Sequence, residues 1–358
     1  MLHFLIPVLG FVGCIGLLIF FHELGHYLAA RSQGVTVEVF SIGFGPALLK
    51  YRARSGTVWQ LSALPLGGYV KMQGWGDTED TTPVEPGSFA AAPLSAKAVI
   101  VAAGPLANLA LAVLLYAFLF MSAGKPVTPA VFTSIQPHSA AAAAGFMPGD
   151  KVVAIGGTRV SDFSQLQRIV TQNPDAELDF TILRGGREFS QQVDLGAVRQ
   201  DGTHIGHLGV TAKPVFIRLG PVSAIGAAFQ QTGAVITSWG AEMRRLIVRH
   251  QGLSDLSGPI GIAEVTGQVA AMGWGPLVDL LAFLSINLGL VNLIPIPILD
   301  GGHLLFYGWE AVMRRKVSGQ AREMGLRLGA LLILTLFLVT TFNDLTRIGV
   351  FAWFSHLL

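Results

Sequence analysis

The chain has 358 residues, of which 51% are apolar and only 13% carry a formal charge, and its formal net charge is +2. Soluble proteins contain about 25% charged residues, so this composition indicates an integral membrane protein with a smaller soluble part. The low net charge predicts no nucleic-acid partner, and the single cysteine excludes an intramolecular disulfide.

Four stretches are apolar enough to cross a bilayer, for which a helix needs about 20 residues. They are residues 4–30, 97–124, 276–302 and 325–353. The first lacks a basic region ahead of it, so we expect a retained span and not a cleaved signal peptide. The third ends in "NLIPIPILDGG". Because proline removes a helix donor, this span should unwind at its end, where protein or water must cover the backbone.

Basic side chains gather in two of the short connecting loops, and this asymmetry sets the expected orientation. They are Arg31, Lys50, Arg52, Arg54, Lys71 and Lys97 between the first two spans, and Arg314, Arg315, Lys316, Arg322 and Arg327 between the last two. Both loops are therefore expected in the cytoplasm. Both termini and residues 125–275 should then lie on the opposite, periplasm-like side.

The long segment after the second span divides into two parts. In residues 125–215, "KVVAIGG" and "ELDFTILRGGREFSQQVDL" predict strands that turn at Gly-Gly pairs, and "DFSQLQRIVTQ" predicts a helix capped at Ser161 or Asp162. Residues 216–275 are expected to form an amphipathic helical connector on the domain or membrane surface, with a substrate-gating element as the alternative.

A second apolar segment, "VWQLSALPLGGYVKM" at residues 58–72, follows the first span. It is hairpin-like but too short and too broken to cross a membrane. We expect a β-loop that dips into the membrane from the cytoplasmic side. Residues 74–96 are polar and rich in proline and glycine, which is typical of a loop.

The strongest chemical signal is "HELGH" in the first span. His22 and His26 are four residues apart, so they share a helix face and both imidazoles can reach one Zn²⁺. Glu23 stands beside them in the position of the general base of His-Glu-x-x-His metalloproteases. An isolated histidine is usually a hydrogen-bonded core residue, but ionisable groups inside a span are costly and are usually functional.

A catalytic zinc takes three protein ligands and keeps one position open. The preferred third ligand is Asp300, at the broken end of the third span and on the same expected side as the two histidines. His303 is the competing ligand. Asp300 also has a purely structural interpretation, as a loop aspartate before a Gly-Gly turn.

Together these motifs resemble the site-2 protease family of intramembrane zinc metalloproteases, most closely its bacterial RseP type, which cleaves anti-sigma factors. The resemblance spans nearly the whole chain and rests on four motifs in order. They are "HELGH" (22–26), "GFGP" (43–46), "GPLAN" (104–108) and "NLIPIPILDG" (292–301). It implies that His22, His26 and Asp300 bind Zn²⁺ and that Glu23 is the catalytic base.

The resemblance also implies how substrate is held. Asn292 would help to hold the substrate backbone or oxyanion near the metal. The segment "PLGGYVKM" (65–72) would be a membrane-associated β-loop that pairs with an extended substrate by strand addition. The residues of this loop expected to bind substrate are Gly67, Gly68, Tyr69 and Val70.

With the resemblance, the expected fold is a polytopic α-helical membrane protein with four transmembrane helices, a membrane-associated β-hairpin and one inserted α+β PDZ-like domain. "SIQPHSAAAAAGFMPGDKVVAIGG" (134–157) carries the PDZ-like signature. "HIGHLGV" (204–210) either accepts a peptide C-terminus or is only a closing strand. Family members with two tandem PDZ domains are known, and this chain has room for one. The expected divisions are 1–124, 125–215 (PDZ-like), 216–275 (connector) and 276–358.

The function implied is regulated intramembrane proteolysis in a bacterial inner membrane. The enzyme would hydrolyse a peptide bond within the transmembrane segment of single-span substrates, such as an anti-sigma factor already cut by a periplasmic protease, and of remnant signal peptides. The PDZ-like domain would exclude untrimmed substrates by size. One alternative, a membrane zinc transporter or sensor, explains the ligands but not Glu23. The other is an inactive PDZ scaffold.

Overall fold

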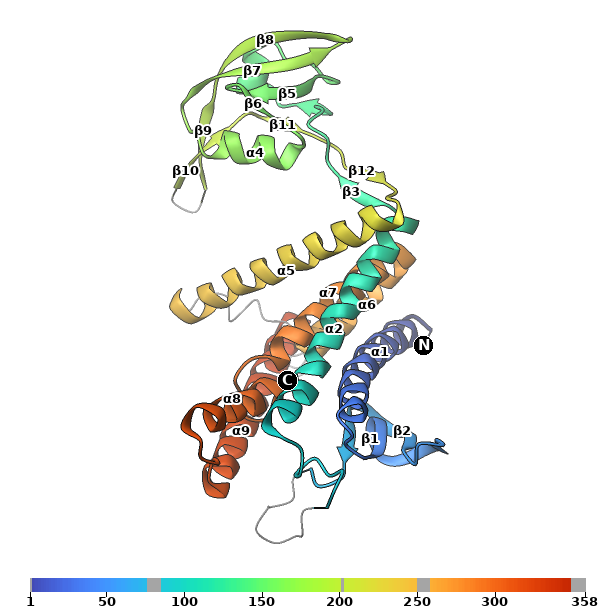
Figure 1. Ribbon diagram of the computed structural model, residues 1–358. Coiled ribbons are helices and arrows are strands. Elements are labelled where there is room, and N and C mark those ends of the chain that lie inside the picture. The colour runs from blue at the N-terminus through green and yellow to red at the C-terminus, as the bar shows by residue number, and fades with distance from the viewer. Residues whose placement is uncertain (1, 76–84, 201–202, 250–257, 349–358) are drawn as a thin grey trace, which may run out of the picture. The chain divides into compact units, whose positions relative to one another are not determined.

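The computed structural model describes residues 2–75, 85–200, 203–249 and 258–348. The chain divides into two compact units (Figure 1). One unit combines Met1–Leu119 with Pro221–Leu358, and the other is Phe120–Gly220. The first is mainly helical, and the second is built mainly from strands.

Four helices among the described residues are long and apolar enough to cross a membrane, as the sequence predicts. They are α1 (Leu2–Ser32), α2 (Leu94–Ser122), α7 (Trp274–Asn292) and α9 (Gly319–Arg347). The expected extension of the last span to residue 353 lies outside the described part of the chain. Leu18, Leu111 and Leu281 form a buried cluster in which α1, α2 and α7 meet.

Small residues bring α1 and α2 close together at the level of the "HELGH" motif. A Cβ atom added to Gly25 would overlap the backbone oxygen of Ala103 and would lie 2.7 Å from the Cβ of Ala107. A Cβ atom added to Gly104 would overlap the His26 imidazole. Glycine is therefore needed at both positions, because small residues let two membrane helices approach until their backbones touch.

The third span unwinds where the prolines predict. α7 ends at Asn292, an irregular segment follows, and α8 (Asp300–Met313) begins at the aspartate. Gly301 and Gly302 pack against this segment, since a Cβ at either position would overlap the carbonyl oxygen of Leu293 or Ile296. The Gly-Gly pair thus lets the first turn of α8 fold back onto the loop, which fixes the position of Asp300.

A two-stranded antiparallel sheet follows α1, formed by β1 (Val37–Arg52) and β2 (Val58–Met72). The hairpin expected within residues 58–72 is not observed. These residues form one long strand, which pairs with the preceding strand β1. Both strands bend, and residues 37–42 pair with residues 68–72 on one side and with residues 58–61 on the other. Residues 68–72 therefore form an edge of the sheet among the described residues.

Two further helices complete the helical unit. The predicted helix after the β-rich unit is confirmed as α5 (Pro221–Arg249), and α6 (Pro259–Ala271) precedes α7. Asp344 near the end of α9 accepts hydrogen bonds from the backbone amides of Gly258 (3.2 Å) and Gly261 (2.8 Å). A carboxylate at a helix N-terminus satisfies unpaired amides, so this contact ties α6 to α9.

The unit Phe120–Gly220 contains a four-stranded sheet in the order β6-β5-β7-β8 and two short helices (Figure 1). The elements of this part are β5 (Lys151–Ile155), β6 (Thr158–Arg159), β7 (Glu177–Arg184), β8 (Arg187–Asp194), α3 (Ala140–Ala143) and α4 (Phe163–Thr171). The predicted turns are confirmed, because both Gly-Gly pairs have positive φ angles and connect antiparallel strands. Asp162 is the predicted cap of α4.

Short strand pairs close this unit. They are β3 (Lys125–Val127) with β12 (Val215–Ile217), β4 (Ser134–Ile135) with β11 (Val210–Thr211), and β9 (Gly196–Gln200) with β10 (Thr203–His207). The pairing of β3 with β12 brings the entering and leaving segments together. Phe132, Phe180 and Ile182 are among the buried side chains of its core.

Candidate metal centre

Three potential metal ligands from distant parts of the chain converge in the helical unit. His22 and His26 lie one turn apart on α1, and Asp300 is the first residue of α8. The Oδ2 atom of Asp300 lies 3.2 Å from the Nε2 atom of His22 and 3.5 Å from that of His26. The two Nε2 atoms are 3.2 Å apart. Both histidines are more than 90% buried, with 9% and 8% of their surface exposed.

These separations fit a single ion. Two ligand atoms, each about 2.0–2.1 Å from a tetrahedral Zn²⁺, lie about 3.3 Å apart. The Asp300 Oδ2 atom is buried and has no hydrogen-bond partner among the described residues. Buried oxygen atoms normally have a partner, and a bound metal ion would supply one here. Two imidazole nitrogens and one carboxylate oxygen also match the ligand types of catalytic zinc sites.

The backbone of α2 orients His26. Its Nδ1 atom lies 2.9 Å from the carbonyl oxygen of Ile100, and a carbonyl can only accept. The Nδ1 atom therefore carries the proton and donates it to Ile100, which leaves the Nε2 lone pair facing His22 and Asp300. Metal-binding histidines generally donate their second ring N–H to such a partner, which fixes the tautomer and the ring orientation.

Asn108 contacts the Nδ1 atom of His22, as the Ile100 carbonyl contacts that of His26. Its side-chain nitrogen lies 3.3 Å from the His22 Nδ1 atom, and its side-chain oxygen is buried with no hydrogen-bond partner among the described residues. A half-turn of the Asn108 amide exchanges these two atoms, so that the oxygen accepts the Nδ1 proton. One rotation then satisfies the orphaned oxygen and leaves the His22 Nε2 lone pair free for a metal. The Ser285 hydroxyl of α7 donates a 2.7 Å hydrogen bond to the backbone carbonyl oxygen of Asn108.

Glu23 lies beside the two histidines on α1 and is also buried, with 9% of its surface exposed. The edge segment of β2 packs against it, since a Cβ atom at Gly68 would lie 3.0 Å from the Glu23 Cγ and 2.7 Å from the Ile19 Cγ2. The sheet therefore covers the side chain proposed as the base. Because Gly68 has no side chain, the backbone of the edge segment comes close to the carboxylate.

The remaining predicted site residues are placed as follows. Gly67, Gly68, Tyr69 and Val70 belong to β2, and Asn292 ends α7. The Tyr69 hydroxyl accepts a 3.0 Å hydrogen bond from Gln60. His303, the competing third ligand, is not part of the group formed by His22, His26 and Asp300. Its ring instead lies 5.7 Å from that of Trp75.

Two partners of the metal centre were not predicted as such from the sequence. Asn108 lies within the "GPLAN" motif, but that motif gave no indication of which side chain it would meet. The Ile100 carbonyl is a backbone atom and has no sequence signal. Both contacts depend on how α2 crosses α1, which the glycines at positions 25 and 104 permit.

Comparison with known proteins agrees with this geometry. The model of peptidase family M50 matches residues 10–336. Metalloprotease MmpA of Caulobacter vibrioides is 32% identical over 100% of both chains. A protein of Mesorhizobium japonicum, provisionally named zinc metalloprotease mll0638, is 37% identical over 96% of this chain and 99% of its own. A similarly named Brucella suis protein, BR1156, is 37% identical over 94% of both chains.

Solved structures are similar to part of the chain, and one of them shows how far the likeness goes. It is the PDZ domain of an SdrC-like protein from Listeria monocytogenes, which is 17% identical and covers 23% of this chain and 84% of that one. Its TM-score of 0.21 is below the level at which a shared fold is indicated.

A His-His-Asp cluster whose two histidines lie beside a glutamate on a helix of membrane length is typical of a membrane metalloprotease. The chain belongs to peptidase family M50, the site-2 proteases, whose members depend on zinc. It is therefore an intramembrane zinc metalloprotease.

Proposed function

We propose that this protease hydrolyses a peptide bond within the transmembrane segment of single-span membrane proteins. One observation carries the proposal: the three candidate ligands lie together, and two of them, with Glu23, are on α1, a helix long and apolar enough to cross a membrane. A site at this depth is placed for a substrate that is itself in the bilayer. An anti-sigma factor after a first periplasmic cut and remnant signal peptides are the substrates implied by the family resemblance.

His22, His26 and Asp300 would hold the zinc ion. When bound, zinc supplies a Lewis acid that lowers the pKa of a water molecule and polarises the substrate carbonyl. Ile100 and Asn108 keep the two imidazoles in the tautomer that presents Nε2 to the ion. The first turn of α8, packed on the loop after α7, holds the Asp300 carboxylate in reach of both rings.

Glu23 is the proposed general base and acid. It would take a proton from the attacking water and pass it to the leaving amine of the cleaved bond. Glu23 follows His22 directly in the chain and is buried, which keeps it near the reacting groups, while it is not one of the three grouped ligands. Asn292, at the end of α7, is proposed to donate a hydrogen bond to the developing oxyanion.

The edge of the β1–β2 sheet is the proposed substrate clamp. A helical substrate hides its carbonyls in its own hydrogen bonds and must become extended before it can be cut. In the described part of the chain, residues 68–72 pair with residues 37–42 on one side only, so their other side can receive an extended peptide. The proximity of Gly68 to Glu23 supports this role, because it brings a peptide on the edge close to the base.

The proposed setting is a bacterial inner membrane. The basic loops after α1 and before α9 support a cytoplasmic location for the active-site side of the helices. The β-rich unit and both termini would then be periplasmic. The sequence signature at residues 134–157 supports a PDZ-like domain in that unit, and its proposed role is to exclude substrates with large periplasmic parts.

The test is cleavage of a single-span substrate by the reconstituted protein, with zinc content measured for each sample. Wild type should cleave, and Glu23→Gln should retain zinc and be about 10²- to 10⁴-fold slower, the usual contribution of general acid–base catalysis. Equal cleavage by both proteins, or none by zinc-loaded wild type, would reject the proposal. Uptake of zinc into vesicles by Glu23→Gln would favour the transporter alternative.

The filtering role has its own test. Removal of residues 127–213 should allow cleavage of a substrate that keeps its full periplasmic domain, while a trimmed substrate is cleaved as before. If the shortened enzyme still rejects the untrimmed substrate, the β-rich unit is not the filter.

A further inference from the structure

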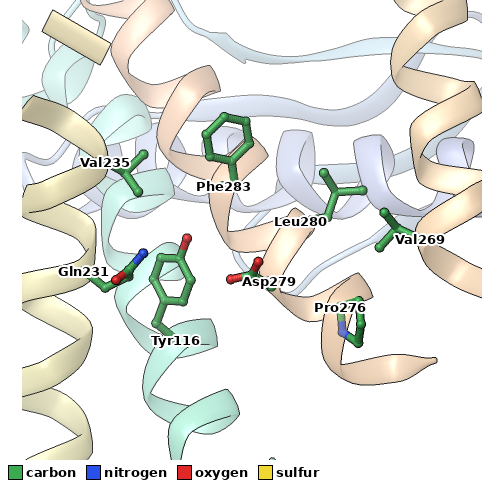
Figure 2. Close-up of a pocket in the computed structure, with 8 residues that line it drawn as sticks. All are labelled: Tyr116, Gln231, Val235, Val269, Pro276, Asp279, Leu280 and Phe283. Carbon is green, nitrogen blue, oxygen red and sulfur yellow. The ribbon is translucent and has the colours of Figure 1, made fainter. Parts of the chain in front are cut away.

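A second polar cluster lies in the helical unit, away from the candidate metal centre. It lines a pocket of about 340 Å³ between α2, α5, α6 and α7. Its polar side chains are Tyr116, Gln231 and Asp279, which turn toward one another across the pocket (Figure 2). The rest of the lining is aliphatic or aromatic, as with Leu280 and Phe283.

Asp279 is unusual because it lies inside a helix of membrane length and has no ion-pair partner among the residues that the structure describes. Tyr116 is buried and hydrogen-bonded to the Gln231 side chain, whereas Asp279 forms no ion pair with any residue in the described part of the chain. Two other carboxylates of the helical unit are partnered: Asp344 binds two amides and Glu264 pairs with Arg347. Carboxylates within membrane spans are rare and normally have a partner or a function.

The pocket lies at a defined level relative to the metal centre. Tyr116 is eight residues beyond Asn108 on α2, which is about 12 Å along a helix. Asp279 is six residues before Ser285 on α7, or about 9 Å. The Ser285 hydroxyl binds the Asn108 backbone carbonyl, so Ser285 and Asn108 lie at the same height, and both distances are counted from there. The pocket is thus about 10 Å from the metal-centre level, toward the end of α2 that leads into the β-rich unit.

We propose that this pocket binds one basic side chain, lysine or arginine, from the outer half of the substrate's transmembrane segment, and that the Asp279 carboxylate pairs with it. This inference rests on the proposed function. The apolar lining suits the methylene stem of such a side chain, while the carboxylate receives its charged head. A distance of about 10 Å corresponds to roughly three extended or seven helical residues outward from the cut.

The lining also argues against other occupants. An acidic group would be repelled by Asp279, and an apolar side chain would leave the carboxylate unpaired. An aminophospholipid carries a phosphate beside its amine, and no lining residue is basic to receive it. A lysine or arginine side chain brings the positive charge alone.

The experiment uses single-span substrates that differ at one position, three to seven residues outward from the cut, with Lys, Met or Glu. Wild type should cleave the Lys form about tenfold better than the Met form, measured as kcat/KM, at one or more of these positions. In Asp279→Asn this ratio should fall to about one, and in Asp279→Lys the Glu form should become the better substrate. Each ratio compares two substrates of one variant, so a general loss of activity cancels.

Glu323→Gln is the matched control, since it removes a carboxylate on α9 that is exposed and paired with Arg327. It should keep the wild-type ratio. An unchanged ratio in Asp279→Asn, or no preference for Lys at any position, would overturn the proposal. So would cleavage of the Met form that depends on both Asp279 and the aminophospholipid content of the vesicles, which would indicate a lipid site.

A binding measurement separates this proposal from the proposed function. With Glu23→Gln, the Lys-containing segment should bind about tenfold more tightly than the Met-containing one, and the added Asp279→Asn change should remove the difference. If zinc-loaded wild type cuts neither form, the proposed function fails. The difference in binding between the two forms still shows whether the pocket binds a basic side chain. If both forms are cut and bind equally, only the pocket proposal fails.

Discussion

Gly104 of α2 lies against the His26 imidazole so closely that a Cβ atom at this position would overlap the ring. The same helix supplies the Ile100 carbonyl that accepts the His26 Nδ1 proton. One face of α2 therefore both makes room for a candidate zinc ligand and orients it. This relationship links the "GPLAN" and "HELGH" motifs, which are far apart in the sequence.

Gly104→Ala should displace His26 and weaken zinc binding by at least about tenfold, since overpacking a tight contact costs about 1–3 kcal/mol. The measurement is zinc retention against a chelator series, with protease activity as a second readout. Gly16→Ala is the control, because nothing lies within 4 Å of a Cβ at that position on α1. Equal zinc affinity in the two variants would contradict the packing described.

Asn108→Ala should lower zinc affinity by about 10- to 100-fold, the usual effect of removing an outer hydrogen-bond partner of a metal-binding histidine. Asn108→Asp should retain more affinity, because a carboxylate still accepts the His22 Nδ1 proton. Asn287→Ala serves as the control, since the Asn287 side chain donates a hydrogen bond within its own helix, to the Phe283 carbonyl oxygen. If Asn108→Ala binds zinc as wild type does, Asn108 does not orient His22.

Asp300→Ala and His303→Ala distinguish the two candidates for the third ligand. Asp300→Ala should lose tightly bound zinc, because its Oδ2 atom lies within 3.5 Å of both Nε2 atoms. His303→Ala should keep about one zinc per chain, as expected for a residue outside the ligand set. Zinc content is measured by atomic emission after dialysis. The reverse result would make His303 the ligand.

Gly68→Ala should reduce proteolysis without loss of zinc. Its Cβ atom would lie 2.8 Å from the Ser41 carbonyl oxygen and 3.0 Å from the Glu23 Cγ, so the edge segment must shift. We expect kcat/KM to fall about tenfold, which is equivalent to the overpacking cost of about 1.4 kcal/mol. Parallel zinc and activity measurements separate this variant from Gly104→Ala. Loss of zinc in Gly68→Ala would show that the sheet supports the ligands as well.

The β-rich unit should lose stability at acid pH through Asp150. Arg184 donates hydrogen bonds of 2.6 Å to both Asp150 carboxylate oxygens, and this pairing is the main cause that lowers the pKa of Asp150. Because the folded-state pKa is the lower one, the stabilisation is complete above the unfolded value of about 4 and is lost as the pH falls through the folded value.

Arg184→Gln should therefore lower the urea midpoint of this unit at pH 7 and reduce the further decrease between pH 7 and pH 3. The midpoint can be followed in the full chain by hydrogen exchange and mass spectrometry. The control is Arg187→Gln, an exposed position at the start of β8. Equal pH dependence in wild type and Arg184→Gln would show that the pair does not link stability to pH.

Much of the helical framework was predictable because it depends on local composition and periodicity. Long apolar runs predicted the four membrane-length helices, and the prolines after Asn292 predicted where the third would unwind. The pairing of β2 with β1 is local, because only residues 53–57 separate the two strands and their turn contains Gly56, which has a positive φ angle. The bends that give residues 37–42 a partner on each side have no such local signal.

The candidate site also combines features that follow from local sequence with features that depend on tertiary packing. The sequence by itself determined that His22 and His26 share a face with Glu23 beside them, because helix geometry fixes the relation of residues four apart. Only the tertiary structure decided that Asp300 and not His303 joins them, that Asn108 and Ile100 meet the rings, and that Asp279 faces a pocket. The physical reason is that these contacts depend on helix crossings, and glycines that permit a crossing do not specify which side chains will meet there.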